Sequence, residues 1–242
     1  MFWSYLIWPR WNNALSYDER KSLGSNLKIF IPDLINFWQI NSNTELVEVL
    51  DKYLILWDEI VFEEVEENKL VSKKGLKNYL FFELNGTKYA IFDNHNVALY
   101  FIWEYFLETW EKLDLIHIDQ HSDLWKPDFI PERISSEEDL VNYTFTWTNV
   151  WNYLIPAQKL WFINQIYQVR TEYKLMQLAP DFVNWKILNI DLDFWSDDMA
   201  TTRESLLRLK KLIPYAKLVL FATSPYFIDQ NKAISLIKEL LI

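Results

Sequence analysis

The segment Asp119-Gln-His121-Ser-Asp123 carries two carboxylates and an imidazole at alternate positions, directly after the run Leu-Ile-His-Ile at residues 115–118. Residues at i, i+2 and i+4 lie on one face of a chain that stays extended, so these side chains are expected to project together. Carboxylates and imidazoles suit divalent Mn, Fe, Co or Zn, whereas oxygen ligands alone would suit Mg or Ca. Because turns seldom require a histidine between two aspartates, the segment is as consistent with a metal site as with a plain turn.

Two further clusters follow other apolar runs. Asp191 and Asp193 come after the run at residues 187–190, and His95 stands two residues after Asp93, directly before a stretch with helical spacing. Taken alone, an Asp-x-Asp pair is more typical of a turn or cap, and a histidine before a helix is more typical of a solvated cap. The occurrence of all three clusters after successive predicted strands favours one shared metal site.

The carboxylates of such a shared site would repel one another. Two unit charges 4 Å apart repel by about 1 kcal/mol even in bulk water, and by more in a cleft. Two divalent cations carry the four positive charges that would balance Asp119, Asp123, Asp191 and Asp193. We therefore expect two divalent metal ions as cofactors.

An alternation of strand-like and helix-like stretches begins at Thr87. Apolar runs that end in polar clusters lie within residues 88–95, 113–123, 159–164, 185–195 and 216–225, and helix-like stretches lie at residues 97–111, 150–157, 201–213 and 228–241. This alternation predicts an α/β fold in which a mainly parallel sheet is covered on both faces. Ligands of such sheets bind beyond the carboxyl ends of the strands, where three of these runs carry Asp or His.

The first 85 residues are harder to interpret. We expect a strand at residues 27–31 and a helix-prone acidic stretch at residues 44–67, in which Leu50, Leu54 and Trp57 recur at helical spacing. Because no repeat, low-complexity tract or Pro/Gly/Ser-rich linker interrupts the sequence, we expect a single domain over residues 1–242.

The composition excludes several kinds of site. Only three glycines occur, Gly24, Gly75 and Gly86, so neither a P-loop nor a dinucleotide-binding glycine motif can be assembled. The absence of cysteine removes thiol nucleophiles, disulfides and thiolate zinc sites. Aromatic residues make up 17% of the chain, which predicts a core of large flat side chains or an aromatic-lined cleft.

The charge balance bears on partners and location. A formal net charge of −10 without a basic stripe argues against nucleic acid as a partner. The apolar start lacks the basic region and cleavage site of a signal peptide, and it stops at Pro9, far short of a membrane span. We expect a cytoplasmic protein that acts on a small-molecule substrate without binding a membrane, and a homo-oligomer is left open.

The three Asp and His clusters together resemble the metal site of the arginase/agmatinase and deacetylase superfamily, also called the ureohydrolase superfamily. His95 matches its upstream histidine, residues 119–123 match its DxHxD strand end, and residues 191–193 match its DxD strand end, in the same order over residues 87–225. The phrases HIDQHSDL, NIDLDFW and ATSPYFI are similar to an uncharacterised branch of this superfamily. The resemblance implies an arginase-like, three-layer α/β/α fold.

The resemblance also implies roles for these residues. It implies a dinuclear centre, often of manganese, in which Asp119 and Asp191 bridge the ions and hold a metal-bridging hydroxide. The shared chemistry is attack of that hydroxide on a C–N bond of an amidine or amide. The other ligands would divide between the two ions, in the pairs His95 with Asp123 and His121 with Asp193.

Other positions depart from the pattern of the arginases. No histidine follows His121, so the downstream histidine that arginases carry is missing from the sequence. Where arginases carry a glutamate that holds the guanidinium, the matching strand ends in Thr223 and Ser224. We therefore expect the metal centre to carry over, and arginine specificity not to.

Five residues near the motifs are weaker candidates for contacts to a ligand or to substrate: His117, Asn149, Asn152, Ser224 and Tyr226. A core histidine, a helix cap and a Ser-Pro turn are the simpler interpretations of these residues. The predicted function is metal-dependent hydrolysis of a non-peptide C–N bond in a small amide, amidine or acylated amine. A non-catalytic metal-binding module is the main alternative, ahead of a metallophosphatase, which needs more His and Asn ligands than three histidines allow.

Overall fold

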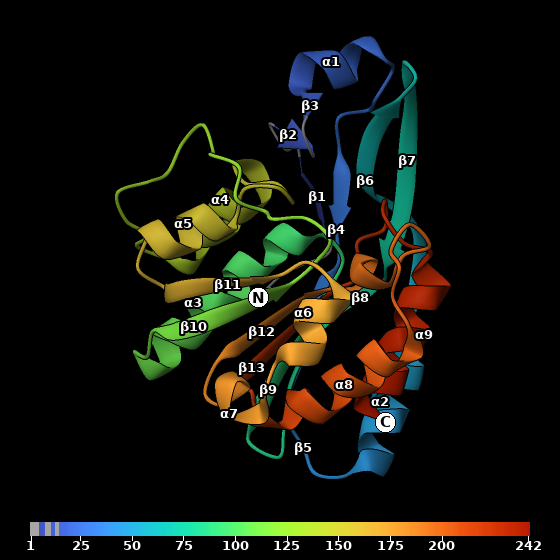
Figure 1. Cartoon of the computed structure of the whole chain (residues 1–242). Helices are drawn as coiled ribbons and strands as arrows, with labels where there is room; N and C mark the ends of the chain where they lie inside the picture. Colours follow the sequence, from blue (N-terminus) through green and yellow to red (C-terminus); the bar gives the residue numbers. More distant parts are fainter. Residues whose placement is uncertain (1–4, 8–10, 13–14) are drawn as a thin grey trace.

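A seven-stranded sheet, in the order β11-β10-β12-β13-β9-β8-β5, forms the centre of the molecule (Figure 1). The computed structural model describes residues 5–7, 11–12 and 15–242. The strands of the sheet are β5 Asp33–Ile40, β8 Asn78–Leu84, β9 Thr87–Phe92, β10 Leu113–Ile118, β11 Ile163–Val169, β12 Ile187–Asp191 and β13 Leu218–Ala222. The five strands from β11 to β9 are parallel, and β8 pairs antiparallel with β9. The predicted α/β fold with a mainly parallel sheet is confirmed.

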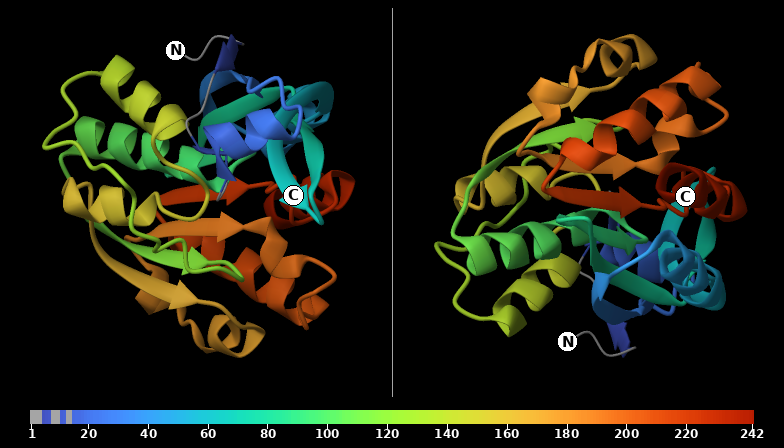
Figure 2. Two further views of the ribbon diagram at one scale, coloured as in Figure 1. Left: turned by 90° about the horizontal axis from the view of Figure 1, so that it is seen from above. Right: turned by 90° about the horizontal axis from the view of Figure 1, so that it is seen from below.

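Helices cover both faces of this sheet. Alternate residues of each strand point to opposite faces, and apolar side chains on both faces pack against helices. All residues of β12 and β13 are buried, as expected for strands enclosed by helices. Leu218 and Leu220 share a core with the helices of one face, α3 Ala98–Thr109, α4 Glu137–Thr146 and α5 Leu154–Lys159. Val219 and Phe221 share the opposite core with α2 Asn43–Tyr53, α6 Glu172–Gln177, α7 Pro180–Val183, α8 Arg203–Leu212 and α9 Gln230–Leu241. Figure 2 shows the resulting three layers from two further directions.

Polar caps mark where several helices begin. The side chains at the starts of α2, α4, α6 and α9 accept the backbone N–H of the residue three positions later; they are Ser42, Ser136, Thr171 and Asp229. Such caps satisfy N–H groups that the first turn of a helix leaves free. Helices α3, α8 and α9 confirm the helix-like stretches at residues 97–111, 201–213 and 228–241, whereas α5 begins only at Leu154, halfway through the stretch at residues 150–157.

The prediction of a helix over residues 44–67 is wrong beyond the end of α2. Strand β6 Leu56–Glu66 pairs antiparallel with β7 Lys69–Leu76 in a separate hairpin. Glu67 and Asn68 both have positive φ, 48° and 63°, which is the backbone of a two-residue hairpin turn. This turn and the β-branched and aromatic residues of β6 outweigh its acidic, helix-prone composition.

Two other predicted strands are shorter or displaced. Trp161 has a φ of 65° after the end of α5, so the strand expected within residues 159–164 starts only at Ile163. The strand expected at residues 27–31 is present as β4 Ile29–Ile31, paired with β1 Tyr5–Ile7. The remaining elements are β2 Trp11–Asn12, β3 Leu15–Ser16, α1 Tyr17–Ser22, and the short helices η1 His95–Val97, η2 Leu192–Trp195 and η3 Ile213–Tyr215.

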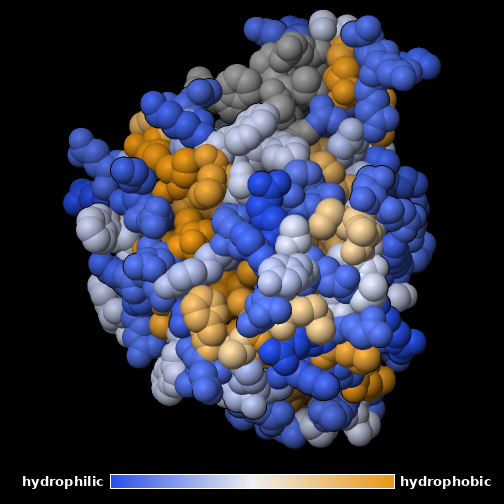
Figure 3. Space-filling view, viewed as in Figure 1, coloured by the Kyte–Doolittle hydropathy of each residue, from blue (hydrophilic) through white to orange (hydrophobic). Residues whose placement is uncertain are grey.

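The surface mixes polar and apolar side chains. On the face shown in Figure 3, most side chains are hydrophilic, and apolar ones gather beside α4 and α5. Among the helices of residues 15–242, none has the length and apolar character that crossing a membrane requires. The expected location and partners stay predictions.

Candidate metal centre

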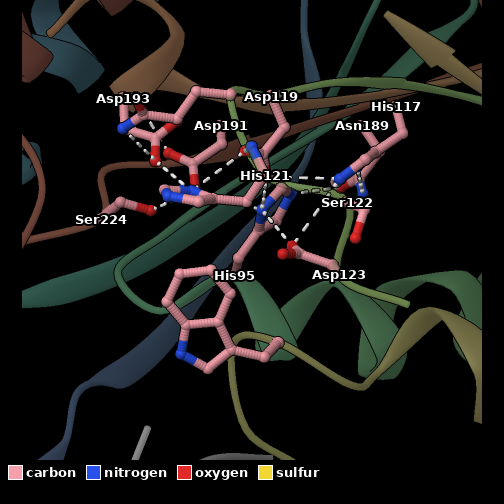
Figure 4. Close-up of polar contacts among 12 residues, drawn as sticks. His95, His117, Asp119, His121, Ser122, Asp123, Asn189, Asp191, Asp193 and Ser224 are labelled. Carbon is pink, nitrogen blue, oxygen red and sulfur yellow. Dashed lines mark hydrogen bonds and ion pairs between the residues drawn. The ribbon is translucent and has the colours of Figure 1, made fainter. Parts of the chain in front are cut away.

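The three Asp and His clusters meet at one edge of the central sheet, beyond the carboxyl ends of its strands (Figure 4). Asp119 directly follows β10, Asp191 is the last residue of β12, and His95 comes shortly after β9. Because these strands run parallel, their carboxyl ends reach the same edge. Side chains from three distant segments of the chain therefore form one group.

One ring nitrogen of His95 faces three carboxylates. Its Nδ1 atom lies 3.0 Å from Asp119 Oδ2, 3.1 Å from Asp123 Oδ2 and 3.2 Å from Asp191 Oδ2. Each of these four side chains is at most 5% exposed. These atoms form a first set of candidate metal ligands, which is shielded from bulk water.

A second set of candidate ligands lies beside the first and nearer the surface. His121 Nδ1 lies 3.0 Å from Asp193 Oδ2 and 3.4 Å from Asp119 Oδ1. The side chain of His121 is 25% exposed, whereas those of Asp119 and Asp193 are at most 1% exposed. Asp119 therefore directs one carboxylate oxygen to each set, as an aspartate shared between two sites would.

The chain does not stay extended through either acidic segment, so the condition under which these side chains would share one strand face is not met. After β10, the backbone N–H of His121 donates to Asp119 Oδ1, and Asp123 has a positive φ of 52°. After β12, the N–H of Asp193 donates to Asp191 Oδ1 at 2.9 Å, where η2 begins. In both segments an aspartate closes a tight turn with the residue two positions later. These turns bring the carboxylates together.

Burial and mutual charge shift the pKa values of the cluster. Burial alone would lower the pKa of His121, but hydrogen bonds to Asp119 and Asp193 raise it to about 10. Burial and the charge of Asp119 raise the pKa of Asp123 to about 6. Burial and the charges of Asp191 and Asp119 hold the pKa of Asp193 well above its usual range. Bound protons therefore compensate part of the negative charge in the metal-free protein, and a cation would replace them.

Some buried atoms of the cluster have no hydrogen-bond partner within the part of the chain that the structure describes. They are Asp123 Oδ2, Asp193 Oδ1 and His117 Nε2. A buried carboxylate oxygen without a partner is costly unless an ion or a water molecule satisfies it. Ligand atoms lie within 4.8 Å of one another in two groups, His95 with His117, Asp119 and Asp123, and Asp119 with His121 and Asp193. The buried cluster could therefore hold metal ions, and its nitrogen and oxygen donors suit divalent transition metals.

Two of the five weaker candidates contact this cluster. The hydroxyl of Ser224 donates to Asp191 Oδ2 at 2.6 Å. His117 Nε2 lies 3.3 Å from Asp119 Oδ2, so His117 faces the same way as Asp119, as its position two residues earlier on the strand predicts.

The other three weaker candidates make contacts elsewhere. Asn152 Oδ1 accepts the N–H of Asn149, and Asn149 Oδ1 accepts the N–H of Trp151, both at 2.9 Å. These bonds shape the turn before α5 and favour the simpler interpretation of both asparagines. The hydroxyl of Tyr226 donates to Glu66 Oε1 on β6 at 2.8 Å, which directs this side chain toward the hairpin.

Sequence reasoning missed two residues, Asn189 and Tyr153. Asn189 lies on β12 two residues before Asp191, and its side chain contacts both His95 and His117 and the hydroxyl of Tyr153. The period of two along a strand would have placed Asn189 on the same side as Asp191. Tyr153 comes from the turn before α5, and no sequence signal connects it with the clusters.

Aromatic rings border the exposed side of the cluster. The ring of His121 lies 4.5 Å from that of Trp151 and 4.9 Å from that of Phe227, between ring centres. Trp151 also packs edge-on against Phe227 and stacks on Trp125, both at 5.5 Å. Aromatic side chains therefore lie beside His121, the most exposed of the six predicted ligands.

Close packing behind the site depends on Gly75 in β7. A Cβ atom there would lie 2.5 Å from Val61 Cγ2 and 2.7 Å from Asp93 Oδ1. Asp93 is fully buried, and its Oδ1 accepts the backbone N–H of Leu76 at 2.8 Å, which restrains it from moving aside. We expect Gly75→Ala to lower the free energy of unfolding, measured by urea titration, by about 1–3 kcal/mol.

The control is Lys69→Ala, at the exposed start of the same strand. It should change the free energy of unfolding by less than about 0.5 kcal/mol. Equal effects of the two substitutions would contradict the packing argument.

No protein-family model matches this chain, and no curated protein matches it. Function is therefore inferred from the geometry of the Asp and His cluster and from its sequence motifs, which lie together at the carboxyl ends of the parallel strands.

Proposed function

We propose that this protein is a metal-dependent hydrolase that uses two divalent ions to cleave a non-peptide C–N bond. The observation that carries the proposal is the position of Asp119, whose two carboxylate oxygens face two separate sets of Asp and His side chains. A single structural ion would need only one set. The proposed ligands are the six residues of the three clusters, His95, Asp119, His121, Asp123, Asp191 and Asp193.

The resemblance to the arginase/agmatinase and deacetylase superfamily supports the same proposal. The order of the DxHxD and DxD segments, the histidine upstream of them and the mainly parallel sheet all agree with that superfamily. We therefore propose that the chain is an arginase-like member with manganese as its metal. Fe, Co and Zn are the alternatives, because they accept the same ligand types.

Two such ions, when bound, would supply an activated water molecule for hydrolysis. The chain's own residues would hold and shield them. Asp119 contacts both sets of ligands, and the Ser224 hydroxyl orients Asp191 by donating to its Oδ2 atom. Trp151 and Phe227 reduce the access of bulk water to His121.

The end of β13 bears on the choice of substrate. Thr223 and Ser224 carry neutral hydroxyls where a guanidinium would need a carboxylate, and the hydroxyl of Ser224 already donates to Asp191. A guanidinium without that partner would lose roughly 1.5–3 kcal/mol of binding free energy, or one to two orders of magnitude in affinity. Neutral amides and acylated amines are therefore favoured over arginine.

A non-catalytic metal-binding module is the second candidate. The burial of the cluster favours it, since His121 is the only one of the six proposed ligands that is more than 5% exposed. A substrate would have to approach past this one histidine and the rings beside it. Both candidate functions predict bound metal, and only the hydrolase predicts turnover of a substrate.

Metal content and turnover test the proposal in two steps. Protein purified without chelator or affinity-tag metal should contain two equivalents of divalent metal per chain, measured by plasma mass spectrometry. A panel of neutral amides and acylated amines, supplied in turn with Mn, Fe, Co and Zn, should then release amine, and arginine should release urea at least about ten-fold more slowly.

Each outcome of this test has a separate meaning. Two equivalents of metal without any turnover would favour the non-catalytic module. Efficient urea release would contradict the specificity argument and leave the metal assignment standing. Metal content near zero, after incubation with all four metals, would contradict both candidates.

A further inference from the structure

Asn189 lies at the centre of a buried polar network behind the proposed ligands (Figure 4). Its side-chain oxygen Oδ1 lies 3.1 Å from Nε2 of His95. Its nitrogen Nδ2 lies 3.1 Å from Nδ1 of His117 and 2.7 Å from the hydroxyl oxygen of Tyr153. All four residues are at most 1% exposed, so bulk water does not compete for these contacts.

The hydrogen-bonding capacity of a primary amide determines where the protons of this network lie. Nδ2 of Asn189 has two hydrogens, and its two neighbours, His117 Nδ1 and the oxygen of Tyr153, accept one each. Oδ1 can only accept, so Nε2 of His95 must carry a proton. A neutral His95 then has its lone pair on Nδ1, the atom that faces the carboxylate of Asp119.

The same reasoning gives His117 a different role from His95. Because Nδ1 of His117 accepts a hydrogen bond, its proton in the neutral ring is on Nε2. That Nε2 atom lies 3.3 Å from Asp119 Oδ2 and 3.7 Å from Asp123 Oδ2. A protonated Nε2 offers no lone pair to a cation, and in this structure that atom has no hydrogen-bond partner among the described residues.

We propose that Asn189 is a positioning residue that selects the metal-binding tautomer of His95 and the non-ligating tautomer of His117. The inference rests on the proposed metal site, since a lone pair on His95 Nδ1 matters only where a cation binds. It assigns His95 to the metal through Nδ1 and removes His117 from the ligand set. Losing such a contact to a metal-binding histidine typically weakens metal binding 10–100-fold.

The ring nitrogens of the wild-type protein test this proposal directly. Long-range proton–nitrogen correlation spectra of isotope-labelled, zinc-loaded protein distinguish protonated, unprotonated and metal-bound ring nitrogens, and three histidines contribute. We expect His95 to carry its proton on Nε2 and zinc on Nδ1, and His117 to carry its proton on Nε2 with Nδ1 unprotonated. Zinc bound to His117 or to Nε2 of His95 would overturn the role of Asn189 and leave the metal site intact. Failure to bind zinc would overturn both the metal site and this inference.

Two substitutions separate the contacts to the two histidines. Asn189→Asp keeps an acceptor for His95 but has no N–H for His117, so the ring proton of His117 should move to Nδ1 while that of His95 stays on Nε2. Asn189→Leu removes both contacts, and its zinc affinity in calorimetric titrations should fall 10–100-fold. Unchanged zinc affinity in Asn189→Leu, or a ring proton of His117 that stays in place in Asn189→Asp, would overturn the proposal.

Gln230→Leu is the matched control for loss of a buried amide. Gln230 is 9% exposed and donates to the backbone oxygen of Thr223 at 2.7 Å, outside the histidine network. We expect this variant to keep the zinc affinity and the histidine spectra of the wild type. A ten-fold loss of zinc affinity in this control would attribute the effect to lost stability and overturn the role of Asn189. If Asn189→Leu does not fold, the spectra of the wild type and of Asn189→Asp decide.

Discussion

Replacement of Asp191 by asparagine should remove most of the metal from the protein and lower its turnover by at least about 100-fold, the upper end of what loss of a supporting contact causes. Asp191 Oδ2 lies 3.2 Å from His95 Nδ1 and accepts a hydrogen bond from Ser224. Asparagine keeps the shape of the side chain but removes its negative charge and replaces one oxygen with a hydrogen-bond donor. Metal content by plasma mass spectrometry and kcat/KM for the best substrate measure the two effects.

Asp197→Asn is the matched control for this substitution. Asp197 lies a short distance further along the chain, is 96% exposed and pairs with Lys232. An exposed ion pair contributes little to stability, so this variant should retain full metal content and turnover. Full metal content in Asp191→Asn would refute the metal assignment, and equal losses in both variants would show that the effect is not specific to the site.

Removal of the metal should lower the melting temperature of the protein. An ion that binds only the folded chain, at 100 times its Kd, stabilises it by about 2.7 kcal/mol. For a chain of this size that corresponds to roughly 5–11 °C, and a second ion adds to it. Scanning calorimetry before and after chelation, and again with excess Mn, measures the shift and its reversal. An unchanged melting curve after verified metal removal would count against the site.

The increase in melting temperature that the metal causes should depend on pH. Hydrogen bonds to Asp119 and Asp193 outweigh burial and raise the pKa of His121 to about 10, above the ordinary value of 6.5. In the metal-free protein this contribution to stability is complete below about pH 6.5 and is lost as the pH rises toward 10. A metal ion needs an unprotonated imidazole, so its binding strengthens over the same range. The difference in melting temperature between loaded and metal-free protein should therefore be larger at about pH 9 than at about pH 6.5.

The fold was predictable where strands are enclosed by helices and unpredictable where they form a hairpin. Strands β12 and β13 are buried on both faces, so they appear in the sequence as short apolar runs. Strand β6 alternates less clearly, and its turn at Glu67 and Asn68 contains no glycine, the residue that usually marks a two-residue hairpin turn. Local composition there favours a helix, and the pairing with β7 decides otherwise.

In the candidate site, too, some features could be predicted from the sequence and others could not. The clustered Asp and His residues could be predicted because each group directly follows a parallel strand, and such strand ends meet at one edge. The turns that aim Asp119 and Asp191 inward depend on backbone hydrogen bonds that residue types alone do not reveal. Asn189 follows the period of two of its strand, whereas the position of Tyr153 depends on how the turn before α5 packs onto the sheet.

The position of β13 has a consequence for synthesis of the chain on the ribosome. It is the last strand along the described chain, yet it lies inside the sheet, where Val219 pairs with both Leu188 of β12 and Tyr89 of β9. Until β13 emerges from the ribosome, β9 and β12 each expose a row of unpaired backbone N–H and C=O groups beside apolar side chains. Such edges pair readily with other chains, and a growing chain exposes them while translation continues at about 5–20 residues per second. A chain that stops before β13 therefore carries every proposed ligand but lacks the strand that joins the two halves of the sheet, and it is left prone to aggregation.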